Sequence, residues 1–116
     1  MDFVERRETE PLLVKDTRNS FTSTDLQRRL DALGVTRVVI TGIQTEQCAE
    51  TTARIAADLG YDVDFVTEAT LTFPIRDARS GDELSCDDII RRTEFVLRDR
   101  FARIATVGDL VEELSA

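Results

Sequence analysis

The spacing of apolar residues predicts a helix followed by a strand in the first half of the chain. Three leucines recur at spacings of four and three before Gly34, which predicts an amphipathic helix beginning near Thr24: Leu26, Leu30 and Leu33. The next segment, VTRVVITGI, is rich in β-branched residues and apolar at three consecutive positions. That pattern is typical of a strand buried on both faces of a parallel sheet.

The same two patterns alternate through the rest of the chain. A second helix is predicted from about Thr45 to Leu59, ending at Gly60. YDVDFVTEA alternates as a strand, a loop follows, and a third helix begins near Ser85, whose spacing to Asp88 is that of a capping box. RIATV is a last short strand and GDLVEEL a closing helical turn, while PLLVK near the start suits an edge strand behind its proline.

Strands and helices in alternation predict an α/β fold, with a parallel sheet, helices on both faces and right-handed crossovers. We expect a Rossmann-like arrangement of three layers. The 116 residues contain only two prolines and five glycines, and no internal linker or repeat interrupts them. They therefore predict one domain, residues 1–116.

Composition and charge exclude several classes of partner. No apolar run approaches the ~20 residues needed to span a bilayer, and the N-terminus is charged, so we expect a cytoplasmic protein with no membrane partner. The net charge of -8, with arginines scattered among carboxylates, argues against nucleic acid. The two cysteines are expected to be reduced thiols.

The absence of histidine restricts the chemistry. The chain has none, so neither a Cys-His pair nor a Ser-His-Asp triad can form within it, nor a metal site that needs imidazole. Cys48 lies where the central strand gives way to a helix. If Thr45 is the N-cap, the thiol falls in the first helical turn, where the dipole favours a thiolate and free N–H groups can hold an oxyanion. The alternative is a small apolar residue tucked under a helix start.

The segment GVTRVVITGIQTEQCAETTARIAADLGYDV resembles the nucleophile segment of the isochorismatase-like cysteine hydrolases, which include nicotinamidases and carbamoylsarcosine amidases. The matching residues are Gly42, Thr45, Cys48, Thr52, Ala53 and the pair Gly60 and Tyr61. The resemblance continues upstream in VKDTRNSFTSTDLQRRL and downstream in TEATLTF and IIRRTEFVLRDRFARIAT, so it covers nearly the whole chain.

The resemblance implies a role for each residue of the site. Cys48 would be the nucleophile, Lys15 the catalytic lysine, and the backbone N–H groups of Gln44 and Cys48 the oxyanion hole. The family also has a non-proline cis peptide bond, which would fall between Ile43 and Gln44. Taken alone, Lys15 is better explained as a solvated lysine at a strand end, and the resemblance reverses that preference.

Further positions are assigned around this centre. Phe21 matches a position that often lines the substrate pocket, although a core anchor is the alternative, and Thr45 is placed in the same pocket. Glu68 stands where the family commonly has an aspartate and would support the polar frame of the site. Cys86 matches no catalytic position and is expected to be structural.

The resemblance also leads us to expect an N-terminally incomplete domain. The family's catalytic aspartate ends a first strand well before the lysine, and we do not carry that role onto Asp2. Two strands of the family's sheet would be absent as well. The chain would then be the C-terminal portion of a longer hydrolase, a shortened product that closes its sheet differently, or a chain that borrows strands. The metal ligands of the nicotinamidase branch would lie in the same absent part, so we assign no metal and no cofactor.

Two functions follow. The first is a hydrolase of a small amide or another C–N bond that acts through a Cys48 thioester on a small-molecule substrate. The second is a non-catalytic α/β module that acts through oligomerisation or a partner subunit, because exposed sheet edges would favour assembly. In either case we expect a homo-oligomer.

Overall fold

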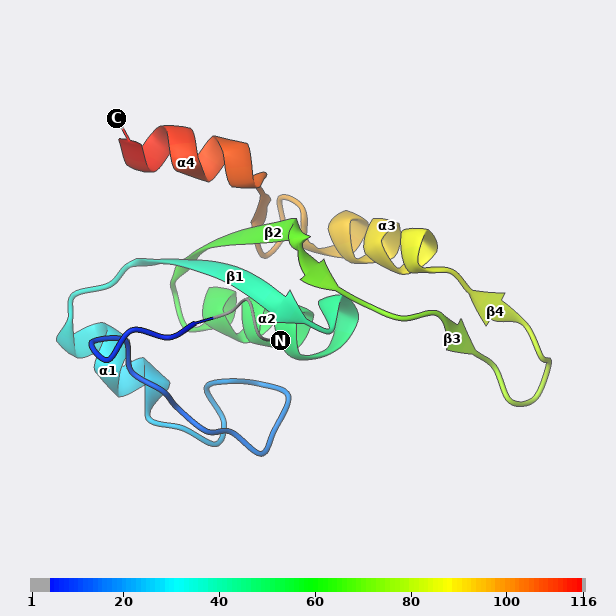
Figure 1. Ribbon diagram of the computed structural model, residues 1–116, viewed down its shortest axis with the longest axis horizontal. Coiled ribbons are helices and arrows are strands. Elements are labelled where there is room, and N and C mark those ends of the chain that lie inside the picture. The colour runs from blue at the N-terminus through cyan, green and yellow to red at the C-terminus, as the bar shows by residue number, and fades with distance from the viewer. Residues whose placement is uncertain (1–4, 116) are drawn as a thin grey trace.

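The computed structural model of the chain describes residues 5–115, so Asp2 lies outside the described residues. The helices are α1 (Leu26–Ala32), the π-helical turn η1 (Thr45–Ala49), α2 (Glu50–Asp58), α3 (Cys86–Leu97) and α4 (Val107–Ser115) (Figure 1). The strands are β1 (Arg37–Ile43), β2 (Asp62–Leu71), β3 (Ile75–Arg76), β4 (Glu83–Leu84) and β5 (Arg103–Ile104). None of the helices between residues 5 and 115 is long and apolar enough to cross a bilayer.

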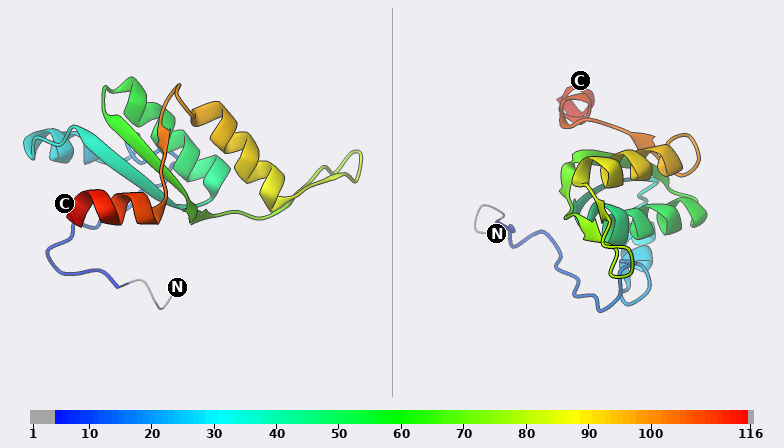
Figure 2. Two further views of the ribbon diagram at one scale, coloured as in Figure 1. Left: turned by 90° about the horizontal axis from the view of Figure 1, so that it is seen from above. Right: turned by 90° about the vertical axis from the view of Figure 1, so that its right-hand side faces the viewer.

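The main sheet is parallel and has helices on both faces. Its strands lie in the order β1-β2-β5, and both pairings are parallel. Helices α2 and α3 cover one face, and α4 lies on the other side of the sheet (Figure 2). The predicted α/β fold with a parallel sheet is therefore confirmed.

The core lies between α2 and the sheet. Three alanines of the η1–α2 segment are buried at helical spacing: Ala49, Ala53 and Ala56. They meet Val63 and Phe65 of β2, and Phe65 is fully buried. Small side chains on the helix let its backbone approach the strands closely, so the position of α2 fixes the turn that precedes it.

Strand β1 differs from its prediction, because it is not buried on both faces. Its exposure alternates, with Val38 and Ile40 packed against the core while Val39 on the opposite side is 46% exposed. The reason is that α4 packs against β2 rather than over β1. The sequence predicted the strand correctly and its second face incorrectly.

The predicted edge strand from Pro11 to Lys15 is not formed. The segment lies outside both sheets, and Val14 is 83% exposed. A short apolar run becomes a strand only where another strand supplies hydrogen bonds. The described residues place no strand beside this one, so its apolar pattern has nothing to pair with.

The end of α2 and the start of α3 follow the sequence closely, and the predicted loop after β2 contains a small hairpin. The Ser85 hydroxyl accepts the N–H of Asp88 at 3.1 Å, which confirms the predicted start of α3. Gly60 closes the helix before it at a φ of 98°. Within the loop, β3 and β4 form a separate antiparallel pair.

The pairing of β1 with β2 changes register next to the turn that leads to η1. Ile40 pairs with Phe65, but Gly42 pairs with Thr70, so β2 accommodates extra residues between the two points. Gly42 has a φ of 124°, a region that L side chains rarely adopt, and glycine is therefore required there. The irregularity turns the chain out of the sheet toward η1.

An ion-pair network ties α4 to the sheet. Asp64 is buried on β2, and both the Arg37 and Arg103 guanidiniums donate to its carboxylate. The same arginines hold Glu113 of α4, Arg103 at 2.7 Å and Arg37 at 3.1 Å. The hydrogen bond from Arg103 in particular lowers the pKa of Glu113 to about 2. Three strands and one helix thus share one cluster of charges.

Tyr61 joins the N-terminal part of the chain to the core. Its phenol donates a hydrogen bond of 2.6 Å to Asp31 at the end of α1, and its ring stacks on Phe21 with centroids 6.0 Å apart. The hydrogen bond to Asp31 and the burial of the phenol raise the pKa of Tyr61 to about 12. The neutral phenol is the form that the fold stabilises.

We predict that absorbance at the tyrosinate band will titrate with a midpoint near pH 12, because this pKa is raised to about 12. Tyr61 is the single tyrosine and there is no tryptophan, so the signal has one source. Its contribution to stability is present below pH 10, the ordinary value, and is lost as pH rises toward 12. Asp31→Asn should move the midpoint toward 10, whereas Asp58→Asn should not. A midpoint near 10 in the parent chain would contradict the bond to Asp31.

Candidate active site at the end of strand β1

Cys48 lies where the sequence analysis placed it, in the first turn after β1. The peptide bond between Ile43 and Gln44 is cis, at the position that the resemblance implied. Gln44 has an extended backbone, and its carbonyl accepts the N–H of Ala49 at 3.3 Å, which closes a π-helical turn. Such turns are frequent at functional sites. Cys48 is a free, half-buried thiol within it.

Lys15 and Cys48 line the same pocket although they are far apart in the sequence. The pocket has a volume of about 250 Å³, and Ser20 and Thr52 line it too. The Lys15 ammonium donates to the Thr17 carbonyl at 2.8 Å, so it is held by its own loop. A cationic group and a thiol thus line one hollow that runs along β1 from Val39 to its carboxyl end at Ile43, the end of a parallel strand near which ligands collect in α/β folds.

Thr52 holds the loop of residues 15–24, which carries Lys15 and is called the lysine loop below, against α2. It is buried, and its hydroxyl accepts the N–H of Ser20 at 3.1 Å. The same oxygen lies 3.3 Å from the Ser20 hydroxyl and 3.5 Å from the Arg18 carbonyl. Since Thr52 is one helical turn after Cys48, this contact determines where the loop with Lys15 lies relative to the thiol. The sequence analysis matched Thr52 to the family but gave it no role.

Thr45 does not cap the helix and does not line this pocket. Gln44 occupies the N-cap position, and the Thr45 side chain is buried. Its hydroxyl lies 2.7 Å from that of Thr70, which donates to the Thr67 carbonyl. Thr45 is therefore the donor in the first contact, and it ties η1 to the end of β2. The expected cap was wrong because a buried acceptor on β2 competes for the same hydroxyl.

Two other residues differ from their expected places. Phe21 stacks on Tyr61 and packs against the core, so the alternative of a core anchor describes its position better than the pocket wall. Glu68 accepts the N–H of Val107 at the start of α4, and is exposed there. Glu68 therefore supports a helix start on another part of the sheet rather than the frame of the site.

Polar side chains that the sequence analysis did not single out surround the turn. Gln47 donates to the Gln44 side chain at 2.7 Å and accepts from Arg18 at 3.2 Å. On the other side, the Thr72 hydroxyl donates to Glu46 at 2.6 Å. The only sequence clue was their position, because both glutamines and the glutamate belong to the QTEQ run before Cys48.

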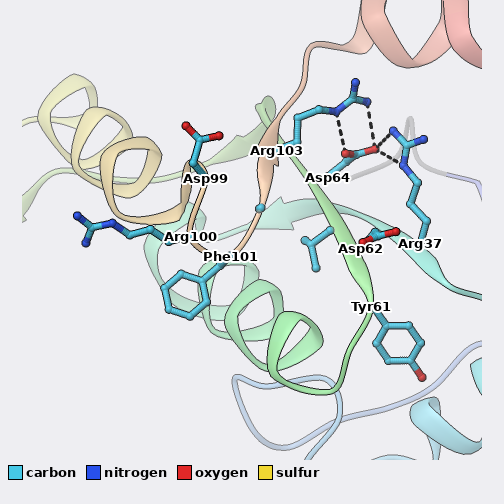
Figure 3. A pocket seen from close by; sticks show the side chains of 10 residues that line it. Arg37, Tyr61, Asp62, Asp64, Asp99, Arg100, Phe101 and Arg103 are labelled. Carbon is cyan, nitrogen blue, oxygen red and sulfur yellow. Dashed lines mark hydrogen bonds and ion pairs between the residues drawn. The ribbon is translucent and has the colours of Figure 1, made fainter.

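A larger hollow lies at the opposite end of the strands, and neither cysteine lines it. It has a volume of about 520 Å³, and residues at the amino ends of β1, β2 and β5 line it (Figure 3). Arg37 and Arg103 converge there on Asp64 (Figure 3), and Glu113 supplies the second negative charge that balances the two guanidiniums. The smaller pocket is the better candidate because it contains the thiol. Residues 5–115 hold no group of three or more side chains suited to a metal ion.

Comparison with known proteins gives one family. The model of the isochorismatase domain matches residues 1–83. The uncharacterized isochorismatase family protein YrdC of Bacillus subtilis is 32% identical over 114 residues, covering 97% of this chain and 59% of that protein. Nicotinamidase 3 of Arabidopsis thaliana is 44% identical over 62 residues, covering 53% of this chain and 31% of that protein.

Solved structures agree with the fold. An isochorismatase family protein from Chromobacterium violaceum superimposes with a TM-score of 0.89 at 28% identity, covering 96% of this chain and 57% of that one. The chain therefore spans less than two thirds of the length of each of these three proteins.

We predict that Thr52→Val will loosen the lysine loop without unfolding the chain. The change keeps the shape of the side chain but removes the oxygen that holds Ser20, a bond worth about 1 to 2 kcal/mol when buried. Hydrogen exchange across residues 16–24 should accelerate about tenfold, which corresponds to a loss of that size. Thr52→Ser keeps the oxygen and is the matched control. Equal exchange in both variants would show that Thr52 does not position the loop.

Proposed function

The chain belongs to the isochorismatase family, and on that basis we propose that it carries the nucleophile and the lysine of a cysteine hydrolase. The substrate we propose is a small molecule with an amide or another C–N bond. The observation that carries the proposal is the shared pocket of Lys15 and Cys48 at the carboxyl end of β1. Similarity to a protein named a nicotinamidase supports an amide among the possible substrates.

The proposed reaction begins with attack of the Cys48 thiolate on the carbonyl carbon. A C–S bond forms, and the π electrons of the carbonyl move to its oxygen. The backbone N–H groups of Gln44 and Cys48 would donate to that oxyanion. When the carbonyl re-forms, the C–N bond breaks, and the amine leaves with a proton from the Lys15 ammonium.

The second half of the reaction restores the enzyme. Neutral Lys15 takes a proton from water, whose oxygen attacks the thioester carbon. The C–S bond then breaks, the acid is released, and Cys48 returns as a thiolate beside the Lys15 ammonium. One water is consumed and no oxidant or reductant is needed, as hydrolysis requires.

The pocket itself supplies no carboxylate to relay protons. Among the described residues that line it, Lys15 is the single titratable side chain besides Cys48. General acid–base catalysis by one group raises the reaction rate about 10²–10⁴-fold. A pocket without a proton-relaying carboxylate therefore lowers the rate without abolishing the reaction. We therefore expect the chain on its own to be a weak hydrolase.

We predict that Cys48 will be alkylated by iodoacetamide at least about fivefold faster than Cys86 at neutral pH, since it shares a pocket with the cationic Lys15 and is partly exposed, the setting in which reactive cysteines are found. Peptide mass spectrometry resolves the two thiols in one sample, and Cys86 is the internal control. Lys15→Met should slow Cys48 and leave Cys86 unchanged. Equal rates at both thiols in the folded chain would mean that the nucleophile site is not assembled.

We predict slow release of ammonia or amine from a panel of small primary amides, measured with an enzyme-coupled assay. Cys48→Ala should abolish it because no thioester can form, and Lys15→Met should reduce kcat by about 10²-fold or more. Cys86→Ser should retain the parent rate. Turnover that survives Cys48→Ala would rule out the mechanism, and a folded chain with a reactive Cys48 but no turnover would favour the non-catalytic alternative.

A further inference from the structure

Arg18 of the lysine loop lies alongside the segment that carries the candidate nucleophile. The Thr52 hydroxyl lies 3.5 Å from the Arg18 carbonyl, and the Arg18 guanidinium donates through Nε to the Gln47 side chain at 3.2 Å. Gln47 directly precedes Cys48 and Thr52 follows it by one helical turn, so these two contacts lie roughly 7 Å apart along the helix axis. The Arg18 side chain therefore runs past the position of the thiol.

Two glutamines hold the guanidinium in this place. Gln47 accepts from Arg18 through Oε1 and donates through Nε2 to the Gln44 side chain at 2.7 Å. Because both ends of the Gln47 amide are engaged, its oxygen stays directed toward Arg18. Gln44 follows the cis peptide bond, and its backbone N–H is the one assigned above to the oxyanion hole. A side chain held in advance in this way loses little conformational entropy when it binds a ligand.

Most of the hydrogen-bonding capacity of Arg18 is unused. A guanidinium has five N–H donors, and within residues 5–115 only the Nε of Arg18 has an acceptor. Arg18 also takes part in none of the ion pairs of this part of the chain, although arginines of α1, β1, α2 and α3 do. The side chain is exposed, so its two terminal nitrogens are open to a ligand. Their spacing suits the two oxygens of a carboxylate.

The charges around the pocket favour an anionic ligand. Lys15 lines the pocket, and its ammonium donates to a backbone carbonyl rather than to a carboxylate. None of the described residues that line the pocket is acidic. The acidic neighbours in the sequence pair with neither cation within residues 5–115: Asp16 is exposed, and Glu46 accepts from the Thr72 hydroxyl at 2.6 Å, beyond the end of β2. The chain has a net charge of -8, so two unpaired cations here are a local excess of positive charge.

We propose that the small amide substrate carries a carboxylate, which Arg18 binds while Cys48 attacks the amide carbonyl at the other end of the molecule. This inference rests on the proposed function, because it names the substrate class of the same site. The pocket of about 250 Å³ is lined by aliphatic and hydroxyl side chains besides Lys15 and Cys48, with no aromatic ring among the described residues. A short aliphatic monoamide of a dicarboxylic acid fits this description.

Arg18 determines specificity in this proposal and takes no part in the bond changes. The carboxylate that it binds is the same before and after the reaction, so water still supplies the oxygen of the new carboxyl group and ammonia leaves. A contact that is equally strong in the bound substrate and in the transition state lowers KM without raising kcat. Loss of the contact should therefore appear mainly in KM.

The first experiment compares monoamides with the matching diamides, such as succinamate with succinamide. The two differ only by an anionic oxygen in place of an NH2 group, and malonic and glutaric pairs vary the distance between the two ends. In the parent chain kcat/KM for the best monoamide should exceed that for its diamide at least about fivefold, as for a partly exposed, charge-assisted contact. Arg18→Met should bring this ratio close to one through a higher KM for the monoamide.

The matched control is Arg79→Met, at an exposed arginine of the turn between β3 and β4, which should retain the parent ratio. A ratio near one for every pair in the parent chain would overturn the carboxylate, although hydrolysis of the diamides would leave the proposed function intact. A ratio that survives Arg18→Met would show that Lys15 alone attracts the anion, and would overturn the assignment to Arg18.

A protection experiment gives a result that does not depend on turnover. Alkylation of Cys48 by iodoacetamide is followed by peptide mass spectrometry with either the monoamide or the diamide present at matched ionic strength. The monoamide should slow alkylation of Cys48 more than the diamide does, Arg18→Met should remove this difference, and Cys86 should react at one rate throughout. Equal slowing by the two compounds, or none by either, would overturn the proposal. Selective protection without turnover would support Arg18 as the carboxylate site and contradict only the proposed hydrolysis.

Discussion

The close contact between α2 and the parallel strands is the constraint on which the rest of the structure depends. Ala49, Ala53 and Ala56 place only small side chains on the buried face of the helix, and the Phe65 side chain packs opposite them. Cys48 and Thr52 each precede one of these alanines, so the contact that builds the core also fixes the thiol and the anchor of the lysine loop. A bulkier residue at Ala53 would push the helix outward and move both.

Hydroxyl groups, rather than charges, hold the candidate site together. Thr45 bonds to Thr70, Thr52 holds the loop through Ser20, and Thr72 reaches Glu46. Threonine hydroxyls do not titrate in the physiological range, so these three contacts do not change with pH there. The side chains that hold the candidate site in place are thus different from the thiol and the ammonium that line its pocket.

Local features were predictable from the sequence, and features that depend on distant partners were not. The cap at Ser85 and the stop at Gly60 are set by neighbouring residues, and both were found as expected. The predictions of a strand at residues 11–15 and of a cap at Thr45 were wrong. Strand pairing and hydroxyl hydrogen bonds depend on partners that are distant in the sequence, which the local pattern does not reveal. For the site, Cys48 and Lys15 followed from the resemblance, whereas the anchoring role of Thr52 needed three-dimensional contacts.

The connection between Thr52 and the loop also has a consequence for the order of events during synthesis. The segment from β1 to β2 is contiguous in sequence and forms a complete strand–helix–strand unit. The lysine loop leaves the ribosome before any of it, when neither Thr52 nor Tyr61 exists to receive it. The loop that carries Lys15 must therefore remain without its hydrogen bonds to Thr52 until α2 has been made.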